Sequence, residues 1–326
     1  MTFKRAYLTA GFGLLLCLFT HPAARSAEEP VTAPQSVIAV QPLESVPAGE
    51  QPLSLYGCYW MWHPGDNATV AAPTIHVIFT GTIALPENDR IARGEFLLHA
   101  DDLFTLMVNG QPAGQGGLNG LIPNPEKQPE PKEETAPPSL PLPVNADITS
   151  LLKPGINQVS IRVINTMPST PAGLAGRWRV RMTSGAVITG EVDRNWKARR
   201  NISKITVSAE PLVAFGQAPW NRVPASIPGP GPFLGVWTHP SPDPEVQAWL
   251  VVDTACDNMS VTVNDSDAIP VGQNLFRADI TSLARNGENR VRIEPCAPAH
   301  VHVELIKKAE DTVSPTGSET DAASAH

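Results

Sequence analysis

Apolar and polar residues alternate with a period of two along much of the chain between residues 53 and 307. Clear examples are 74–85 (TIHVIFTGTIAL), 104–110 (FTLMVNG) and 157–163 (NQVSIRV), and Gly, Pro or Asn bounds such segments. This alternation predicts half-buried β-strands. The longest helical pattern is a single turn near Asp147 and Thr149, which Pro154 and Gly155 end. The pattern therefore predicts an all-β fold built of sandwiches.

The chain contains one sequence pattern twice. Residues 146–163 (ADITSLLKPGINQVSIRV) match 278–293 (ADITSLARNGENRVRI), and 100–110 (ADDLFTLMVNG) match 255–265 (ACDNMSVTVND). The copies are 155 residues apart at the upstream block (100 to 255) but 132 apart at the downstream block (146 to 278), a difference of 23. Two matching blocks with one insertion in the first copy predict two related domains in tandem.

Composition sets the boundaries of these domains. The insertion has eight prolines between residues 123 and 143 with Glu and Lys among them, a composition that cannot bury a core. It is either an arm that docks a partner or a tolerated loop expansion. The predicted parts are a signal peptide (1–26), a linker (27–52), a first sandwich (53–200) with the insertion (113–144), a proline-rich connector (201–232), a second, shorter sandwich (233–307) and a disordered tail (308–326).

The first 26 residues have the pattern of a signal peptide. Lys4 and Arg5 precede a short apolar run at 14–19, and Ala24-Arg25-Ser26 offers a cleavage site before Ala27. A lipid anchor on Cys17 is a weaker alternative, because Leu16 precedes it. The apolar run is shorter than the ~20 residues that cross a bilayer, and no later stretch qualifies. We expect an exported protein, periplasmic or secreted, without a membrane span after signal removal.

Charge and cysteine content fit export. Removal of three cationic residues with the signal peptide changes the formal charge from −8 to −11, which disfavours nucleic acid and anionic membrane surfaces as partners. Three cysteines remain, and Cys256 and Cys296 flank the two blocks of the second copy. We therefore favour a Cys256–Cys296 disulfide, with Cys58 free or paired between molecules. Three buried free thiols are the alternative.

Several segments together resemble a known family. They are 59–69 (YWMWHPGDNAT), 75–86 (IHVIFTGTIALP), 94–114 (GEFLLHADDLFTLMVNGQPAG), 147–165 (DITSLLKPGINQVSIRVIN), 171–181 (PAGLAGRWRVR) and 192–198 (VDRNWKA). In this order they resemble the galactose-binding-like jelly-roll modules of bacterial α-L-rhamnosidases, and sugar-binding domains of β-galactosidase-type glycosidases are similar. The resemblance covers about 56–200. The second copy keeps 235–245 (GVWTHPSPDPE) as its opening, and Asn264-Asp265 replaces the Asn-Gly turn.

The resemblance implies two tandem galactose-binding-like jelly-roll β-sandwiches and a non-catalytic, carbohydrate-binding accessory role. In such glycosidases a separate helical or (β/α) barrel domain carries catalysis, and the chain has no pattern for one. Motifs of serine hydrolases, zinc proteases and phosphate-binding loops are absent too. The expected partner is a glycan. The alternative is a structural or adaptor subunit. It would dock an envelope protein through the proline-rich insertion or through the proline-rich hinge between the two sandwiches, 224–233 (PASIPGPGPF).

Glycan binding would use exposed aromatic faces and nearby polar groups. Trp60 alternates with Trp62 and should face away from it, and Trp220 lies in the connector. We expect Trp60 and Trp220 to be exposed ligand-binding residues with Asn221 and Arg222 beside them. Packing of both indoles between domains is the equal alternative.

The sequence predicts no cofactor and no defined metal site. His63 and His239 stand in similar Trp-x-His or Trp-His contexts of the two copies, which indicates a structural role at strand entry. The fold that the resemblance implies often holds a structural calcium ion. Asp66, Asp101 and Asp102 are carboxylates that could serve, although no diagnostic calcium loop surrounds them.

Overall fold

The computed structural model describes residues 34–44, 50–117, 142–221, 223–240, 243–271 and 276–308. The expected signal peptide, most of the proline-rich insertion, Arg222 and nearly all of the expected tail lie outside these ranges. Within them the regular secondary structure is β-strand apart from one 3-10 turn, η1 (Thr149–Leu151). Among the described residues no helix is long and apolar enough to cross a lipid bilayer.

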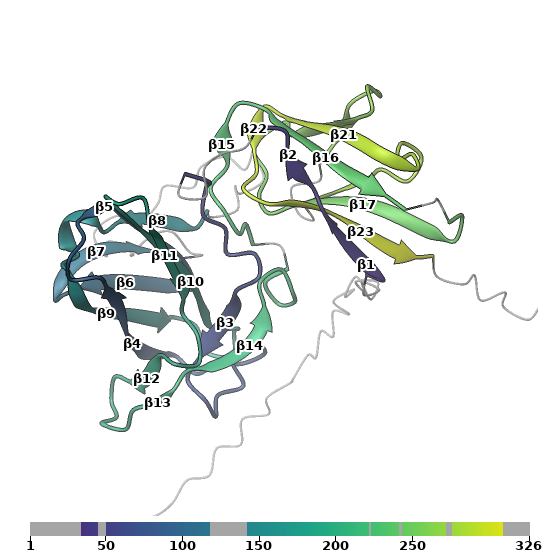
Figure 1. Ribbon diagram of the computed structural model, residues 1–326. Helices are drawn as coiled ribbons and strands as arrows, with labels where there is room; N and C mark the ends of the chain where they lie inside the picture. Colours follow the sequence, from purple (N-terminus) through teal and green to yellow (C-terminus); the bar gives the residue numbers. More distant parts are fainter. Residues whose placement is uncertain are drawn as a thin grey trace, which may run out of the picture. The chain divides into compact units, whose positions relative to one another are not determined.

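Two antiparallel sheets form the first sandwich (Figure 1). Sheet 1 has the order β14-β3-β10-β5-β8, with β11 paired to β10, and sheet 2 has the order β13-β12-β4-β9-β6-β7. The strands of sheet 1 are β3 (Tyr59–Trp62), β5 (Ile91–Asp101), β8 (Val144–Asp147), β10 (Gly173–Met182), β11 (Val187–Glu191) and β14 (Glu210–Ala214). Those of sheet 2 are β4 (Ile75–Leu85), β6 (Leu103–Val108), β7 (Gln111–Gly116), β9 (Gly155–Asn165), β12 (Lys197–Arg200) and β13 (Val207–Ser208).

Alternation places the apolar side chains of both sheets in one core. Trp62, Phe79, Phe96 and Ile161 are fully buried there. A second layer of apolar residues, around Trp60, covers the opposite face of sheet 1. Sheet 1 is thus buried on both faces, which is why β5 is apolar at almost every position from Phe96 to Ala100.

The second sandwich has its own pair of sheets and its own core. Sheet 3 has the order β1-β23-β17-β20 and sheet 4 the order β19-β18-β21-β16-β2, and a separate short pair joins β15 to β22. The strands are β1 (Ser36–Ala39), β2 (Gln41–Pro42), β15 (Gly229–Pro230), β16 (Phe233–His239), β17 (Val246–Val252), β18 (Ser260–Val263), β19 (Ile269–Pro270), β20 (Arg277–Asp279), β21 (Gly287–Glu294), β22 (Cys296–Ala297) and β23 (Val301–Lys307).

Two of these strands correct the expected boundaries. Residues 27–52 were predicted to be a linker, but β1 pairs with β23 and β2 pairs with β16, at the outer edges of sheets 3 and 4. The expected connector, 201–232, is also partly structural. Its strands β13 and β14 extend sheets 2 and 1, and β15 pairs with β22. Strand pairing between distant segments recruits these short pieces, and their own sequence pattern gives little sign of it.

The strand registers define which parts of the two copies correspond. Val108 lies opposite Val159, and Val263 lies opposite Val291 at the equivalent place. On the other edge of β9, Ile83 of β4 lies opposite Asn157. On the other edge of β21, Trp237 of β16 lies opposite Asn289. Strand β16 is therefore the counterpart of β4.

That register corrects two expectations. Residues 235–245 are not the counterpart of the opening at 59–69, and His239 does not correspond to His63. His239 lies opposite Gly287, and its equivalent is Leu85, opposite Gly155. The short Trp-His-Pro similarity had suggested a match that the strand pairing does not support.

The structure joins Cys256 to Cys296 in a disulfide, the pair that the sequence favours. Cys58 is free and buried in the layer around Trp60. Burial raises the pKa of the Cys58 thiol to about 12, so it is held in its unreactive protonated form.

Candidate functional site

Trp60 and Trp220 are not the exposed pair that we expected. Trp60 is fully buried and Trp220 nearly so, and their rings stack with centroids 4.4 Å apart. Trp60 does lie in a different apolar cluster from Trp62, but alternation is not the reason, because residues two apart in a regular strand share a face. Phe215 and Trp220 of the connector cover Trp60. Asn221 is half-buried beside Trp220, and Arg222 lies outside the described residues.

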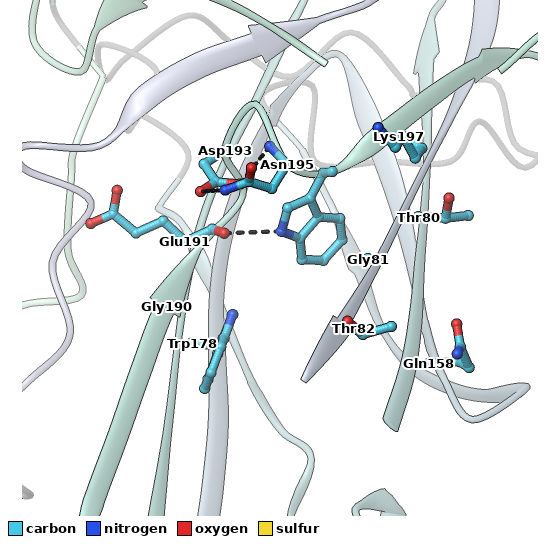
Figure 2. Close-up of a pocket in the computed structure, with 11 residues that line it drawn as sticks. Thr80, Gly81, Thr82, Gln158, Trp178, Gly190, Glu191, Asp193, Asn195 and Lys197 are labelled. Carbon is cyan, nitrogen blue, oxygen red and sulfur yellow. Dashed lines mark hydrogen bonds between the residues drawn. The ribbon is translucent and has the colours of Figure 1, made fainter. Parts of the chain in front are cut away.

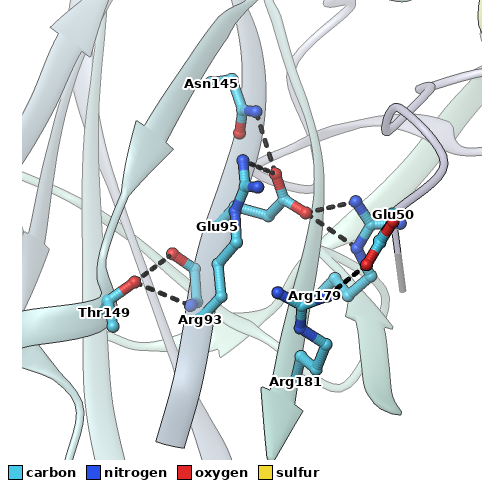
Figure 3. Close-up of polar contacts among 8 residues, drawn as sticks. Glu50, Arg93, Glu95, Asn145, Thr149, Arg179 and Arg181 are labelled. Atoms are coloured by element: carbon cyan, nitrogen blue, oxygen red, sulfur yellow. Dashed lines mark hydrogen bonds and ion pairs between the residues drawn. The ribbon is translucent and has the colours of Figure 1, made fainter. Parts of the chain in front are cut away.

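A second candidate, on the same outer face of sheet 1, is a cluster of charges (Figure 3). Glu95 and Arg179 are both buried and form an ion pair. Asn145 donates to the same carboxylate at 3.1 Å, and Arg93 lies 3.5 Å from it. Both carboxylate oxygens are therefore engaged by the protein itself. Such a satisfied network specifies packing and offers no free group for chemistry.

A cleft on the side of the first sandwich has the geometry of a ligand site (Figure 2). Its volume is about 450 Å³. It lies where β12 begins, because β12 pairs with β4 only over residues 77–80 and its first residue, Lys197, lies opposite Thr80. The lining comes from β4, β9, β10, β11 and the turn before β12, and consists of Thr80, Gly81, Thr82, Gln158, Trp178, Gly190, Glu191, Asp193, Asn195, Trp196 and Lys197.

Two tryptophans form the apolar part of this cleft. Trp178 packs against Gly190, and Trp196 packs against Gly81, where an added Cβ would lie 2.5 Å from the ring. Only glycine allows an indole to approach the strand backbone so closely. The ring of Trp196 is fixed further by a 3.0 Å hydrogen bond from its Nε1 to the Glu191 carbonyl. Both indoles belong to the core and are largely buried, so only a small part of each reaches the cleft.

Several polar groups at the cleft have no protein partner. Within the described residues, the hydroxyls of Thr80 and Thr82 and the amide of Gln158 make no hydrogen bond, and all three residues are exposed. The indole N–H of Trp178 likewise has no acceptor there. Unlike the N–H groups of Trp60 and Trp237, it is not among the buried, unpartnered atoms. These groups can donate to and accept from a polar ligand at no cost to the fold.

The two carboxylates that line the cleft accept hydrogen bonds from other residues of the protein. Arg177 donates to Glu191 Oε1 through its Nε at 3.2 Å and its Nη2 at 2.6 Å. Figure 2 shows this carboxylate on the side away from Thr82 and Gln158. Asp193 accepts two hydrogen bonds from Asn195, one from the backbone and one from the side chain. Neither carboxylate faces the open part of the cleft as a free acid or base.

The expected calcium ligands do not form a site. Asp66 pairs with Arg200 and accepts the Trp62 indole N–H, while Asp101 accepts that of Trp220. Asp102 accepts from the backbone and the hydroxyl of Thr166. Across the described ranges no group of three or more His, Cys, Asp and Glu residues is placed to hold a metal ion. These carboxylates serve the protein's own hydrogen bonding and do not fit a calcium site.

The chain is similar to several solved structures at low sequence identity. No protein-family model matches it, and no curated protein matches it. Among solved structures, an α-L-rhamnosidase from Streptomyces avermitilis complexed with L-rhamnose is 17% identical (TM-score 0.44) and covers 84% of this chain. A lectin from Pleurotus ostreatus is 16% identical in its apo form (TM-score 0.43) and covers 82% of this chain, and its complex with GalNAc is 17% identical (TM-score 0.42).

The chain covers very different shares of these neighbours' own lengths. The chain spans 29% of the Streptomyces avermitilis enzyme and 86% of the apo lectin. None of the sequence signals had pointed to the cleft itself. Trp178 and Trp196 belong to the core, and Thr82 and Gln158 are ordinary outward positions of strands.

Proposed function

We propose that the protein is an exported carbohydrate-binding protein without catalytic activity, and that the cleft between β4, β9 and the β10–β11 hairpin is its glycan site. The observation that carries the proposal is the composition of this cleft. Unpartnered hydroxyl, amide and indole N–H groups and two largely buried tryptophans line a cleft of about 450 Å³. Sugars present hydroxyls that donate and accept, together with small apolar C–H patches.

The state of the carboxylates supports binding without turnover. Glycoside hydrolysis needs two carboxyl groups that flank the scissile bond, one of them available as an acid. In this cleft Glu191 is held by Arg177 and Asp193 by Asn195. A saccharide in the cleft would therefore meet hydrogen-bonding groups but no free catalytic pair.

Titration with saccharides tests the binding site. L-rhamnose and GalNAc, the ligands of the neighbouring structures, and a glycan array are the probes, with tryptophan fluorescence as the readout. We expect Q158A and T82A each to weaken binding by about tenfold, because each removes a hydrogen bond to a sugar hydroxyl. Both residues are exposed, so the melting temperature should stay unchanged.

Gln115 supplies the matched control for this titration. It is equally exposed, but it lies on β7 at the opposite edge of sheet 2. Q115A should bind as the natural protein does. If no saccharide binds, or if Q158A and Q115A bind alike, the cleft is not a glycan site.

Export is a separate part of the proposal and rests on residues 4–26 and on the disulfide, which persists in oxidising compartments. N-terminal sequencing of the protein from fractionated cells should give a chain that begins at Ala27. Recovery of an uncleaved chain from the cytosol would contradict export and leave the assignment of the cleft unaffected.

A further inference from the structure

One end of the first sandwich gathers exposed apolar side chains. Three loops meet there: 63–74 between β3 and β4, 166–172 between β9 and β10, and 201–206 between β12 and β13. Their common position follows from the register, because the first residue of β4 pairs with the last residue of β9. The end of β12 pairs next to it, and a bridge joins Ala72 to Thr170.

Each of the three loops carries a large apolar residue into solvent. Val70 is 63% exposed, Met167 56%, Ile202 88% and Ile205 70%. In the 201–206 turn, the backbone N–H of Ser203 bonds to Arg200 and that of Ile205 bonds to the Ser203 hydroxyl. This tight turn leaves the two isoleucines directed outward. Single exposed apolar residues are ordinary, but four on the loops of one end form a surface that needs a partner.

The three loops, together with the adjoining Arg199 and Arg200, carry a charge opposite to that of the whole chain. The chain has a formal charge of −8. The three loops and the adjoining Arg199 and Arg200 contain one acidic residue, Asp66, and it is buried in an ion pair with Arg200. Arg199 and Lys204 are left without an opposing carboxylate among these residues. Half-buried Asp101 and buried Asp102, at the turn between β5 and β6, also lie at this end, but they bond Trp220 and Thr166. Apart from the paired Arg200, the charged side chains that solvent reaches beside the tips are therefore Arg199, Lys204 and, on β14, Glu210.

We propose that this end of the first sandwich docks onto an anionic lipid bilayer. The apolar tips insert at the boundary between headgroups and acyl chains, and Arg199 and Lys204 contact lipid phosphates. The tips project from three separate loops, a shape that suits a deformable lipid surface better than a protein, which would need a matching pocket for each. The docking is peripheral, and it does not depend on the glycan cleft.

Vesicle co-sedimentation tests this proposal. The protein beginning at Ala27 retains every described strand and lacks the apolar segment at 14–19. It should bind vesicles of equal parts phosphatidylcholine and phosphatidylglycerol, and not vesicles of phosphatidylcholine alone. The double variant I202D/I205D should lose binding by at least about tenfold. K204E should lose about fivefold, and less at high salt.

Matched controls lie at the other end of the same sandwich. Ile156, 62% exposed, is the second residue of β9, at the end opposite to these loops, and exposed Lys153 lies just before the strand. I156D and K153E should bind vesicles as the unsubstituted protein does. Equal losses in I156D and I202D/I205D, or no vesicle binding at all, would overturn the proposal. Self-association or capture of an envelope protein that needs Ile202 and Ile205 in the absence of vesicle binding would assign the surface to a protein instead.

Discussion

A pair of asparagines holds each copy of the repeat together. Asn109 Nδ2 lies 2.8 Å from Asn157 Oδ1, and Asn264 Nδ2 lies 2.7 Å from Asn289 Oδ1. In both copies the first asparagine also donates to a backbone carbonyl in the turn that precedes the second asparagine. The second asparagine accepts a hydrogen bond from the backbone N–H four residues before it. Asn109 and Asn264 have φ of 49° and 50°, a left-handed conformation that asparagine tolerates. The repeated sequence thus encodes one hydrogen-bonded corner, twice.

Removing the second asparagine should destabilise its own copy. Asn157 and Asn289 are fully buried and satisfy several backbone groups. Alanine would leave those groups unpaired, so we expect N157A and N289A each to lower the free energy of unfolding by about 2–4 kcal/mol. Denaturant unfolding measures the loss. Exposed Asn88 is the control, and N88A should change stability by less than about 0.5 kcal/mol.

Asp101 gives a residue-scale prediction of pH dependence. Burial, with the hydrogen bond and the charge of Asp102 adding to it, raises the pKa of Asp101 to about 7. A raised carboxyl pKa contributes stability at low pH that is lost as pH rises through about 7, because the buried side chain must then ionise. D101N removes this cost and can keep the 2.9 Å bond from Trp220.

We therefore expect D101N to be more stable than the natural protein at pH 8, by about 1–2 kcal/mol, and to have no advantage at pH 4. Thermal melting at the two pH values measures the difference. D267N, at an exposed aspartate of the second sandwich, should show no such gain. A D101N advantage that is equal at both pH values would show that ionisation of Asp101 is not its cause.

At the scale of elements, local alternation predicted the long strands and missed what depends on distant partners. Strands β4, β6 and β9 follow the expected periodic segments. Strands β1 and β2 could not be predicted, since four mostly exposed residues and two more carry little pattern of their own. The separation of Trp60 from Trp62 does not follow from a period of two, and no local signal shows that the connector covers Trp60.

The N-terminal strands should be necessary for the second sandwich. Val40 is buried in its core, and β1 and β2 cover the outer edges of β23 and β16. A protein that begins at Glu50 would expose both edges and open this core. We expect limited proteolysis to cut residues 233–307 faster in that form than in the protein beginning at Ala27, while the first sandwich stays resistant. Equal resistance of the second sandwich would show that β1 and β2 are dispensable.

At the scale of the whole molecule, the two core clusters share no residue. The disulfide joins two residues of the second sandwich and closes a segment with a sequence separation of 40, which contributes about 4 kcal/mol by restricting the unfolded chain. The remaining thiol, Cys58, is buried in the first sandwich and protonated at neutral pH. Redox conditions should therefore act on one sandwich and leave the other unchanged.

Calorimetry should accordingly resolve two unfolding transitions, and a reducing agent should lower the temperature of only one. The C256A/C296A variant should reproduce the reduced protein and no longer respond to the reagent, whereas C58A should respond as the natural protein does. N289A should shift the redox-sensitive transition and N157A the other, because each asparagine belongs to one core. A single transition that reduction moves as a whole would instead show that the two sandwiches unfold as one cooperative unit.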